Sequence, residues 1–506
     1  ELKWACPLCP YQSHGWIVTE NNKKFKSLGV NALLNAFKSS LSVLFPLITY
    51  PYAFRILHVE GMGKVNYATS IVSYFSLIAT LGVSTYAVRE GAKLRDRKDD
   101  FEKFSNQIFS LNVFTTLIAY TALTISLVFV NQFREYRMLI ALSSLTIAFT
   151  TLGVEWLNTI FEDYLYITIR SIITHIISLI LLFLFVKNEN DYYTYASLSV
   201  ITTAVICILN WVNCRKYVKL RIVRSIDIKK HAKPILTLFA NSIATTIYVS
   251  ADTTMLGWIS GDYYVGLYSI AVKIYSVVKQ MLAAMYSVTV PRISYFIGIE
   301  DFESARSVFT KLISNIMLVL LPSAVGLITV SKEVILLMGG EEYSLGIPTL
   351  QILSVALIGA IFGGIMTYCL NIPLGREKYN EQATSISAVL NVVLNIFLIP
   401  LFKQDGAALT TLIAEFFVFF YCLYKCKDIR KYVDVSIFFK NMIQTLIGCA
   451  MIFVINSSIS KFCDNILIGL SIKVVVSVLA YGCLLVILRN ELAISILKKL
   501  RRKKMQ

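Results

Sequence analysis

The sequence predicts an all-α membrane protein with about fourteen transmembrane helices, and three features of the chain lead to this prediction. More than half of its 506 residues are hydrophobic and only 16% are charged, whereas a soluble protein carries about 25% charged residues. The apolar residues come in runs of about 20, the length of helix that crosses the hydrocarbon core of a membrane. The two halves of the chain also share a weak repeat, which favours two similar helical bundles.

Short polar connectors separate the apolar runs and define the predicted spans. Each run is expected to be helical, because a segment inside the hydrocarbon core must satisfy its own backbone hydrogen bonds. From the N-terminus, the predicted spans are 28–54, 65–88, 104–131, 138–160, 166–186, 194–213, 234–258, 264–289, 309–330, 349–371, 382–401, 406–424, 437–458 and 466–488.

Membrane topology explains the net charge of +17 better than nucleic-acid binding does. Lysine and arginine lie in the connectors and are concentrated in alternate ones, such as 89–103 and 214–233. Because basic connectors stay in the cytoplasm, we predict that both termini are cytoplasmic. The basic stretch near the C-terminus fits either a membrane-surface anchor or a stop-transfer flank. No nucleic-acid partner is expected.

The connectors and spans divide the chain into six predicted parts. The long basic connector separates the first six spans from the next six, and two further spans follow. The parts are a polar N-terminal extension (1–27), a first six-helix bundle (28–213), a basic cytoplasmic connector (214–233), a second six-helix bundle (234–424), two additional transmembrane helices (425–489) and a basic cytoplasmic tail (490–506).

Corresponding spans of the two halves carry polar residues at the same spacing. In the first span they are Asn31, Asn35, Lys38, Ser42, Pro46 and Thr49, and in the seventh they are Asn241, Thr245, Tyr248 and Asp252. Spacings of three and four place each set on one helical face. Two such repeats are typical of transporters with a cavity where the repeats meet, although small polar residues also pack helices together. Lys38 and Asp252 favour the cavity, because an intramembrane charge is costly and usually functional.

The sequence shows no pattern typical of a catalytic or metal site. The four histidines, at positions 14, 58, 175 and 231, are spread along the chain and form no nucleophile–base or metal-binding pattern. Cys6 and Cys9 form a single C-x-x-C, which is a weak zinc signal without a second pair. The longest outer connector, around 331–348, is short for a membrane-embedded polymerase or ligase. We therefore expect a transporter rather than an enzyme, with no cofactor and no metal.

Several motifs follow one another in the order of a known family. In the first half they are FPLITYPY (45–52) with Arg55, GMG (61–63), LGVSTY (81–86), GVEW (153–156) and ITIRS (167–171). In the second half they are AD (251–252), VGLYS (265–269), IPLGREKY (372–379), the pair Asn391 and Asn395, and GAA (406–408) with Glu415. By this ordered set, the chain resembles the bacterial polysaccharide-repeat-unit flippases (Wzx-type) of the multidrug/oligosaccharidyl-lipid/polysaccharide exporter superfamily over about residues 28–490.

The resemblance implies two six-helix bundles in a V around a central cavity, in a bacterial inner membrane. It implies that the protein moves an undecaprenyl-pyrophosphate-linked sugar unit from the cytoplasmic to the outer leaflet, for O-antigen, capsule or exopolysaccharide synthesis. The expected partners are this lipid-linked glycan, membrane lipid, a coupling ion (proton or sodium), and a polysaccharide polymerase with other assembly proteins. A drug/cation antiporter and a lipid II flippase of the same superfamily are the alternatives.

Five cations are predicted to bind the pyrophosphate headgroup, namely Lys38, Lys273, Arg55, Arg89 and Arg376. Lys38 and Lys273 each lie about nine or ten residues into a span, or roughly 14 Å deep. Their side chains are too short to reach an interface easily, so both are expected to line the cavity. The alternative for both lysines is a structural ion pair, for example with Asp252 or Glu415. For Arg89 and Arg376 the alternative is membrane topology alone.

Three carboxylates are predicted to couple transport to an ion, namely Asp252, Glu415 and, more weakly, Glu155. A buried carboxylate that takes up a proton or binds a cation is a common coupling device in membranes. The alternative is a carboxylate held by a neighbouring lysine. The polar face of the predicted cavity consists of Asn31, Asn35, Ser42, Asn241, Thr245 and Tyr248.

Overall fold

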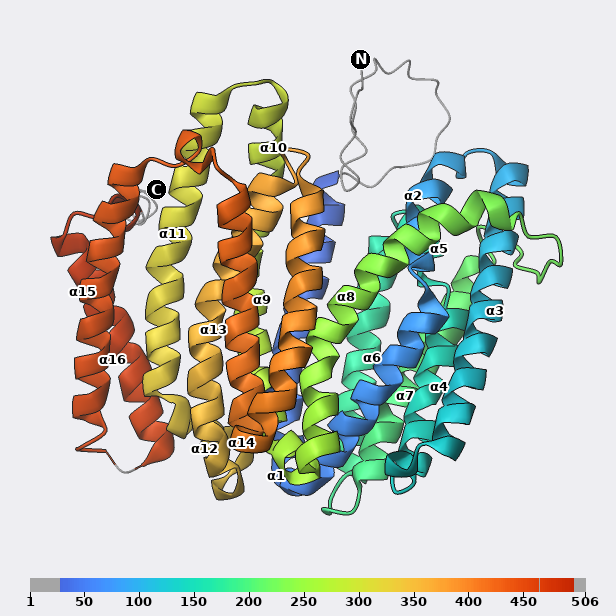
Figure 1. The fold of residues 1–506 in the computed structure, drawn as a ribbon, viewed down its shortest axis with the longest axis horizontal. Coiled ribbons are helices and arrows are strands. Elements are labelled where there is room, and N and C mark those ends of the chain that lie inside the picture. The colour runs from blue at the N-terminus through green and yellow to red at the C-terminus, as the bar shows by residue number, and fades with distance from the viewer. Residues whose placement is uncertain (1–27, 464, 496–506) are drawn as a thin grey trace. The chain divides into compact units, whose positions relative to one another are not determined.

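The computed structural model describes residues 28–463 and 465–495, without the side chains of residues 28–40, 42, 43, 228–230 and 241. Within this part of the chain, every regular element is a helix (Figure 1). The predicted all-α fold is therefore confirmed.

The helices form two compact units that divide between Gly266 and Leu267, near the start of α9 (Asp262–Ser287). The first unit holds α1 (Leu28–Thr80), α2 (Val83–Leu94), α3 (Lys98–Phe129), α4 (Arg137–Leu152), α5 (Glu155–Ile160), α6 (Tyr164–Phe185), α7 (Tyr192–Cys214) and α8 (Ile228–Ser260). The second holds most of α9, then α10 (Val290–Gly298), α11 (Phe302–Thr329), α12 (Ser331–Gly339), α13 (Ile347–Ile365), α14 (Glu377–Lys425), α15 (Val435–Ile459) and α16 (Ile466–Ile487).

Helix α8 belongs to the first unit by packing, because it lies along α1 and also contacts α2. The sequence repeat assigns the same helix to the second half of the chain. Packing therefore divides the chain after α8, whereas the sequence repeat divides it before α8. The grouping into two six-helix bundles stays a prediction.

Eleven segments of the described chain are long and apolar enough to cross a membrane. Two of them, Leu44–Leu94 with 51 residues and Glu377–Lys425 with 49, are more than twice the length of about 20 residues that crosses the hydrocarbon core. A residue with left-handed φ breaks each of them, His58 at 55° in the first and Lys403 at 54° in the second. The first segment breaks again at Leu81 and Gly82, between α1 and α2. Each long segment therefore accounts for two predicted spans.

Helix α9 corresponds to the remaining predicted span. Its 26 residues are enough to cross the hydrocarbon core, but Lys273 and Lys279 lower its mean hydropathy, and it is not among the eleven apolar segments. The charges that weaken its apolar character are the ones expected in a functional membrane helix.

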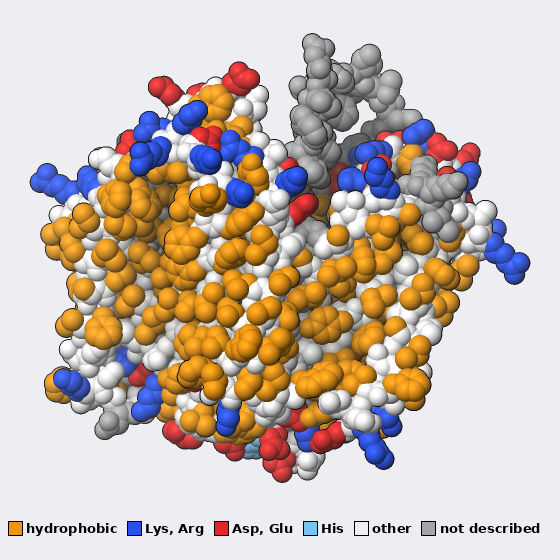
Figure 2. Space-filling model, in the orientation of Figure 1, with side chains coloured by type: hydrophobic (Ala, Val, Ile, Leu, Met, Phe, Trp, Pro, Cys, Tyr) orange, Lys and Arg blue, Asp and Glu red, His pale blue; other side chains and the backbone are white. Residues whose placement is uncertain are grey.

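The sides of the helices are covered by hydrophobic side chains, and lysine and arginine gather mainly near the helix ends (Figure 2). Large apolar residues such as Leu117, Phe129 and Val389 are more than half exposed. A contiguous apolar surface of this kind is unusual on a soluble protein and is expected where helices face lipid.

Each unit has one end that carries its basic connectors. In the first unit, connectors 95–97 and 215–227 meet at this end beside the short helix α5, and in the second unit connectors 372–376 and 426–434 do so (Figure 1). We call it the basic end of the unit. By the rule that basic connectors stay in the cytoplasm, it corresponds to the predicted cytoplasmic side.

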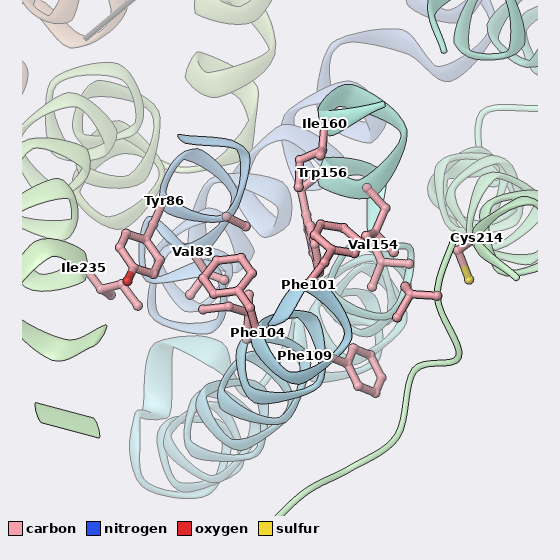
Figure 3. Packing of buried hydrophobic residues seen from close by; sticks show 14 residues of the cluster. Val83, Tyr86, Phe101, Phe104, Phe109, Val154, Trp156, Ile160, Cys214 and Ile235 are labelled. Atoms are coloured by element: carbon pink, nitrogen blue, oxygen red, sulfur yellow. The ribbon is translucent and has the colours of Figure 1, made fainter. Parts of the chain in front are cut away.

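A hydrophobic cluster stabilises the basic end of the first unit (Figure 3). It joins Tyr86 of α2, Phe101 and Phe104 of α3, Trp156 of α5 and Ile235 of α8, all of which are buried. Aromatic residues bury a large area in a compact space. The cluster therefore packs α2 against α3, and α5 against α2.

The basic connector 215–227 lies along α3 as an extended strap. Asn106 Oδ1 accepts a hydrogen bond from the backbone N–H of Arg221 at 2.7 Å, and Ser110 Oγ accepts one from Val223 at 2.8 Å. Polar residues of α3 thus satisfy backbone groups that have no helix or sheet partner of their own. The charged side chains of Arg221 and Arg224 remain exposed.

Candidate functional site

Helix α14 is a hairpin whose two halves share a buried polar seam. Its turn lies at Lys403, and a Cβ on Gly406 would lie only 2.2 Å from the Leu398 carbonyl oxygen, so the two halves approach closely there. Thr410 Oγ1 donates to Asn395 Oδ1 at 2.7 Å, and Asn391 Nδ2 donates to Thr410 Oγ1 at 3.4 Å. The sequence pair Asn391 and Asn395 is therefore part of the packing inside the hairpin.

Glu415 is buried in the second half of this hairpin. Its side chain is 7% exposed, and its Oε1 accepts hydrogen bonds from Lys279 Nζ at 2.5 Å and Tyr275 Oη at 2.8 Å. A Cβ on Gly359 of α13 would lie 2.9 Å from the Phe416 amide nitrogen. Because Gly359 has no side chain, α13 can approach α14 closely and exclude solvent from the carboxylate.

The geometry of α9 determines which lysine reaches Glu415. Tyr275 and Lys279 are four residues apart and lie on one helical face. Lys273 is six residues before Lys279, which places it about 120° around the helix at 3.6 residues per turn. Glu415 is thus paired with a lysine, as the alternative interpretation allowed, but that lysine is Lys279. Lys273 is half-buried and also has an interaction partner.

The other predicted coupling carboxylate in an apolar helix, Asp252, lies in α8. It is 4% exposed and has an interaction partner. Nearby in the same helix, Thr254 Oγ1 donates to Ser70 Oγ at 2.9 Å, and Ser250 Oγ accepts from Ser73 at 3.0 Å. A polar seam therefore joins α8 to α1 close to Asp252. Of the predicted polar face, Thr245 is exposed and Tyr248 is half-buried.

The remaining polar-face residues of the first and seventh spans lie outside the described side chains. They are Asn31, Asn35, Lys38, Ser42 and Asn241, whose backbone belongs to α1 and α8. Their predicted contribution to a cavity stays a prediction.

Glu155 belongs to a polar network in the first unit. Its Oε1 accepts from Arg170 Nη2 at 3.0 Å, with the arginine side chain 3% exposed and the glutamate side chain 49% exposed. Arg170 Nη1 also donates to Asn210, and Asn210 Oδ1 accepts from Asn158 at 2.9 Å. Asn213 donates to Asn158 at 2.8 Å, which extends the network along α7. Here the buried charge is the arginine, and Glu155 lies at its edge.

The predicted headgroup arginines have different surroundings. Arg55 is exposed. Arg89 Nε donates to Glu90 at 3.0 Å at the surface of α2. Arg376 is held more tightly, because its Nη1 and Nη2 donate to the two oxygens of Asp428 at 2.7 and 2.9 Å. The Arg376 guanidinium lowers the pKa of Asp428 to about 2, so this pair stays ionised in the physiological range.

The sequence motifs match a known family. A family model described as "Polysaccharide biosynthesis protein" matches residues 28–297, which is more than half of the chain. The chain belongs to this family. A second family model, MatE, matches residues 237–401. The flippase-superfamily resemblance is therefore confirmed.

Two relatives of this chain are named "Putative O-antigen transporter". The one from Shigella dysenteriae is 24% identical over 399 residues, which cover 78% of this chain and 98% of that protein. The one from Escherichia coli (strain K12) is 23% identical and covers 77% of this chain and 94% of its own. The solved structure "Lipid II flippase MurJ, inward closed conformation" has a TM-score of 0.72 at 18% identity, over 92% of this chain and 99% of that one. This last likeness shows a shared fold.

Two lysines that form ion pairs inside predicted spans were missing from the predicted site. One is Lys279, which pairs with Glu415. The other is Lys473, which lies inside the last span and forms an ion pair with Glu333 of α12, with the lysine side chain 2% exposed. The rule that an intramembrane charge needs a partner could have found both lysines, because both lie inside predicted spans.

Proposed function

We propose that the protein moves a lipid-linked oligosaccharide repeat unit from the cytoplasmic to the outer leaflet of a bacterial inner membrane, for the synthesis of a surface polysaccharide. One observation carries this proposal. The chain belongs to the polysaccharide biosynthesis protein family, and proteins named as O-antigen transporters match it over nearly their whole length. The eleven described segments that are long and apolar enough to cross a membrane also support a role in transport across it.

The substrate we propose is a glycan linked to undecaprenyl pyrophosphate. A pyrophosphate is anionic, so a path for it should offer cations with hydrogen-bond donors. Lys38 and Lys273 are our candidates for holding it midway, within a cavity whose polar face includes Thr245 and Tyr248. Arg55, Arg89 and Arg376 are weaker candidates, because Arg89 and Arg376 already have carboxylate partners.

We propose that Glu415 couples transport to a proton or sodium ion. As a carboxylate, it accepts hydrogen bonds from Lys279 and Tyr275 of α9. A proton on Glu415, or a cation bound to it, would weaken the attraction to the Lys279 ammonium. Helices α9 and α14 could then separate at this point. Asp252 is the second candidate, because it is also a buried carboxylate.

The test is transport by the purified protein in sealed vesicles. A fluorescent short-chain prenyl-pyrophosphoryl oligosaccharide is placed in one leaflet, and its appearance in the other is measured with an impermeant quencher. We expect movement that depends on the protein and is accelerated by an imposed proton or sodium gradient. Equal rates with and without the protein would contradict the proposal.

The match to the MatE model supports a drug/cation antiporter as the second candidate function. The same vesicles distinguish the two, because an antiporter would move a fluorescent organic cation such as ethidium against a proton or sodium gradient. Lipid II, placed in one leaflet in the same assay, tests whether the protein is a lipid II flippase instead. We expect faster movement of the oligosaccharide repeat unit than of either competitor.

A further inference from the structure

A pocket at the basic end of the second unit combines lysines with tyrosine rings. Its volume is about 530 Å³, and its lining consists of Arg376, Tyr379, Tyr424, Lys425, Lys427 and Asp428. We call it the Lys425 pocket. A volume of this size falls in the range of small-molecule sites, which is about 300–1,000 Å³.

The fold brings both ends of the α14 hairpin to this pocket. Tyr379 lies in the first turn of α14, whereas Tyr424 and Lys425 lie at its last turn, 45 and 46 residues later in the chain. The fork between Arg376 and Asp428 ties the residue before α14 to the segment after it, with hydrogen bonds of 2.7 and 2.9 Å. Two parallel hydrogen bonds fix the orientation of both side chains, so this pair acts as a clamp that shapes the pocket.

The clamp also determines the charge of the pocket. The pKa of Asp428 is lowered to about 2 by its hydrogen bonds with Arg376, so the carboxylate is ionised and neutralised by the guanidinium. Burial raises the pKa of the neighbouring Cys426 thiol to about 11, so the thiol adds no negative charge. The lysines at 425 and 427 therefore give the pocket a net positive charge.

Tyrosine rings hold the first of these lysines in place. Lys425 Nζ lies 5.4 Å from the centre of the Tyr421 ring and 5.9 Å from those of Tyr379 and Tyr424. Each ring face attracts an ammonium group. A long, flexible side chain is thus kept at a defined position, ready to meet an anion. The Tyr424 ring is 72% exposed, so it also offers a face to a ligand.

We propose that the Lys425 pocket binds a pyrophosphoryl sugar, with the lysines at the phosphates and the tyrosine rings at the sugar. Ammonium groups suit phosphate oxygens, and aromatic faces with hydroxyl groups suit the mixed polar and apolar surface of a sugar. The source of this ligand is either the lipid-linked glycan of the proposed function, on which this inference partly rests, or a soluble nucleotide sugar. The pocket would be a docking site before translocation, separate from the buried Glu415.

The test measures binding to the purified full-length protein in a neutral detergent. The probes are farnesyl-pyrophosphoryl disaccharide, UDP-N-acetylglucosamine, inorganic pyrophosphate and phosphatidylglycerol. Lys425→Gln/Lys427→Gln removes both ammonium groups, and Lys311→Gln/Lys440→Gln is the matched control, because both of its lysines are exposed and outside the pocket lining. Equal melting temperatures confirm that both variants are folded.

We expect the pocket variant to bind the pyrophosphoryl sugars at least about tenfold more weakly, the loss of two charge-assisted contacts, and the control to bind as the wild type does. Lys425→Arg/Lys427→Arg should restore binding. Tyr379→Leu/Tyr424→Leu should weaken sugar binding but leave inorganic pyrophosphate unaffected. Tighter binding of the farnesyl probe than of UDP-N-acetylglucosamine identifies the lipid-linked source, and similar binding of the two identifies a soluble nucleotide sugar.

Two results would overturn the inference. One is equal affinity of the pocket variant and the control for the pyrophosphoryl sugars. The other is phosphatidylglycerol binding as tightly as the sugars, because the pocket would then recognise only a negative headgroup. Vesicle transport separates this inference from the proposed function. If the wild-type protein binds the probes but moves no lipid-linked glycan, the proposed function is wrong, whereas the inference about the Lys425 pocket is not affected.

Discussion

Each of the two units contains an ion pair in which one side chain is buried and the other is more exposed. The buried side chain of that pair is a cation in the first unit and an anion in the second. In the first unit it is Arg170, whose carboxylate partner Glu155 is half exposed. In the second unit, besides Lys473 with its partner Glu333, the buried partner is Glu415, whose ammonium partner Lys279 is partly exposed. A guanidinium stays charged in a protein, whereas a carboxylate can be neutralised by a proton. The difference suggests a permanent structural charge in one unit and a switchable charge in the other.

The hydrogen-bond partners around each ion pair also differ, in a way that agrees with a structural charge in the first unit and a switchable charge in the second. Arg170 is held by amides that also bind one another, since Asn158 links Asn210 to Asn213. These mutual hydrogen bonds fix the amides relative to one another, so the network resists change. Glu415 has two donors from one face of α9. Loss of the charge on Glu415 would weaken its contact with α9. The amide network around Arg170 would not be affected.

The largest expected effect comes from Glu415→Gln. The amide cannot exchange a proton, and it leaves the Lys279 ammonium without its anion, so we expect transport in vesicles to fall by about a hundredfold, or ~2.7 kcal/mol. Residual transport should not respond to an imposed gradient. Glu155→Gln is the matched control, and we expect it to stay within about twofold of the wild type. Equal losses in the two variants would remove the distinction between the units.

Arg170→Gln should mainly affect stability. It removes charge-assisted hydrogen bonds to Asn210 and Glu155, each of which contributes about 1.5–3 kcal/mol. We expect a loss of about 2 kcal/mol in unfolding free energy, below the sum of the two contributions, because the glutamine amide can still donate a hydrogen bond and Glu155 is half exposed. The loss is measured by thermal unfolding in detergent, and transport per folded molecule should be retained. Arg170→Lys should recover part of the stability. A variant of normal stability with no transport would instead make Arg170 a functional residue.

Arg89→Ala should have a small effect. Arg89 is exposed and paired with Glu90, and exposed ion pairs contribute at most about 1 kcal/mol. We expect the rate of transport to fall by about twofold or less at equal amounts of protein in the vesicles. A tenfold loss would instead support the prediction that Arg89 binds the headgroup.

The smallest expected effect is the pH dependence of docking. Asp428 has its pKa lowered by Arg376, so the clamp is stable above the ordinary pKa of an aspartate, about 4, and is lost only as pH falls towards 2. Between pH 5 and 8 this pair therefore neither gains nor loses a proton. Binding of a farnesyl-pyrophosphoryl sugar should be constant over that range. A steep change in affinity within that window would show that another group controls the pocket.

Much of the fold could be predicted from the chain. Runs of about 20 apolar residues impose helices, because lipid offers no partner to the backbone. The predicted spans 382–401 and 406–424 are the two halves of the α14 hairpin, with the turn at Lys403. Positions of this kind follow from local sequence alone.

The partners of the buried charges depended on tertiary structure. The sequence singled out Glu415, because an intramembrane carboxylate is unusual wherever it lies. It named Lys273 as a possible partner and missed Lys279, since the partner depends on which face of α9 meets α14. Lys473 and Glu333 are separated by 140 residues, and no local pattern connects them.

The sequence by itself therefore determined the apolar helices, their approximate ends and the charged residues that had to be explained. The tertiary structure decided which of these charges meet, at Arg170, Glu415 and Lys473, and that Arg376 and Asp428 close a pocket at the two ends of one hairpin. The physical reason is a difference in range. Helix formation in lipid depends on neighbours a few residues apart, whereas an ion pair depends on the rotation and packing of whole helices.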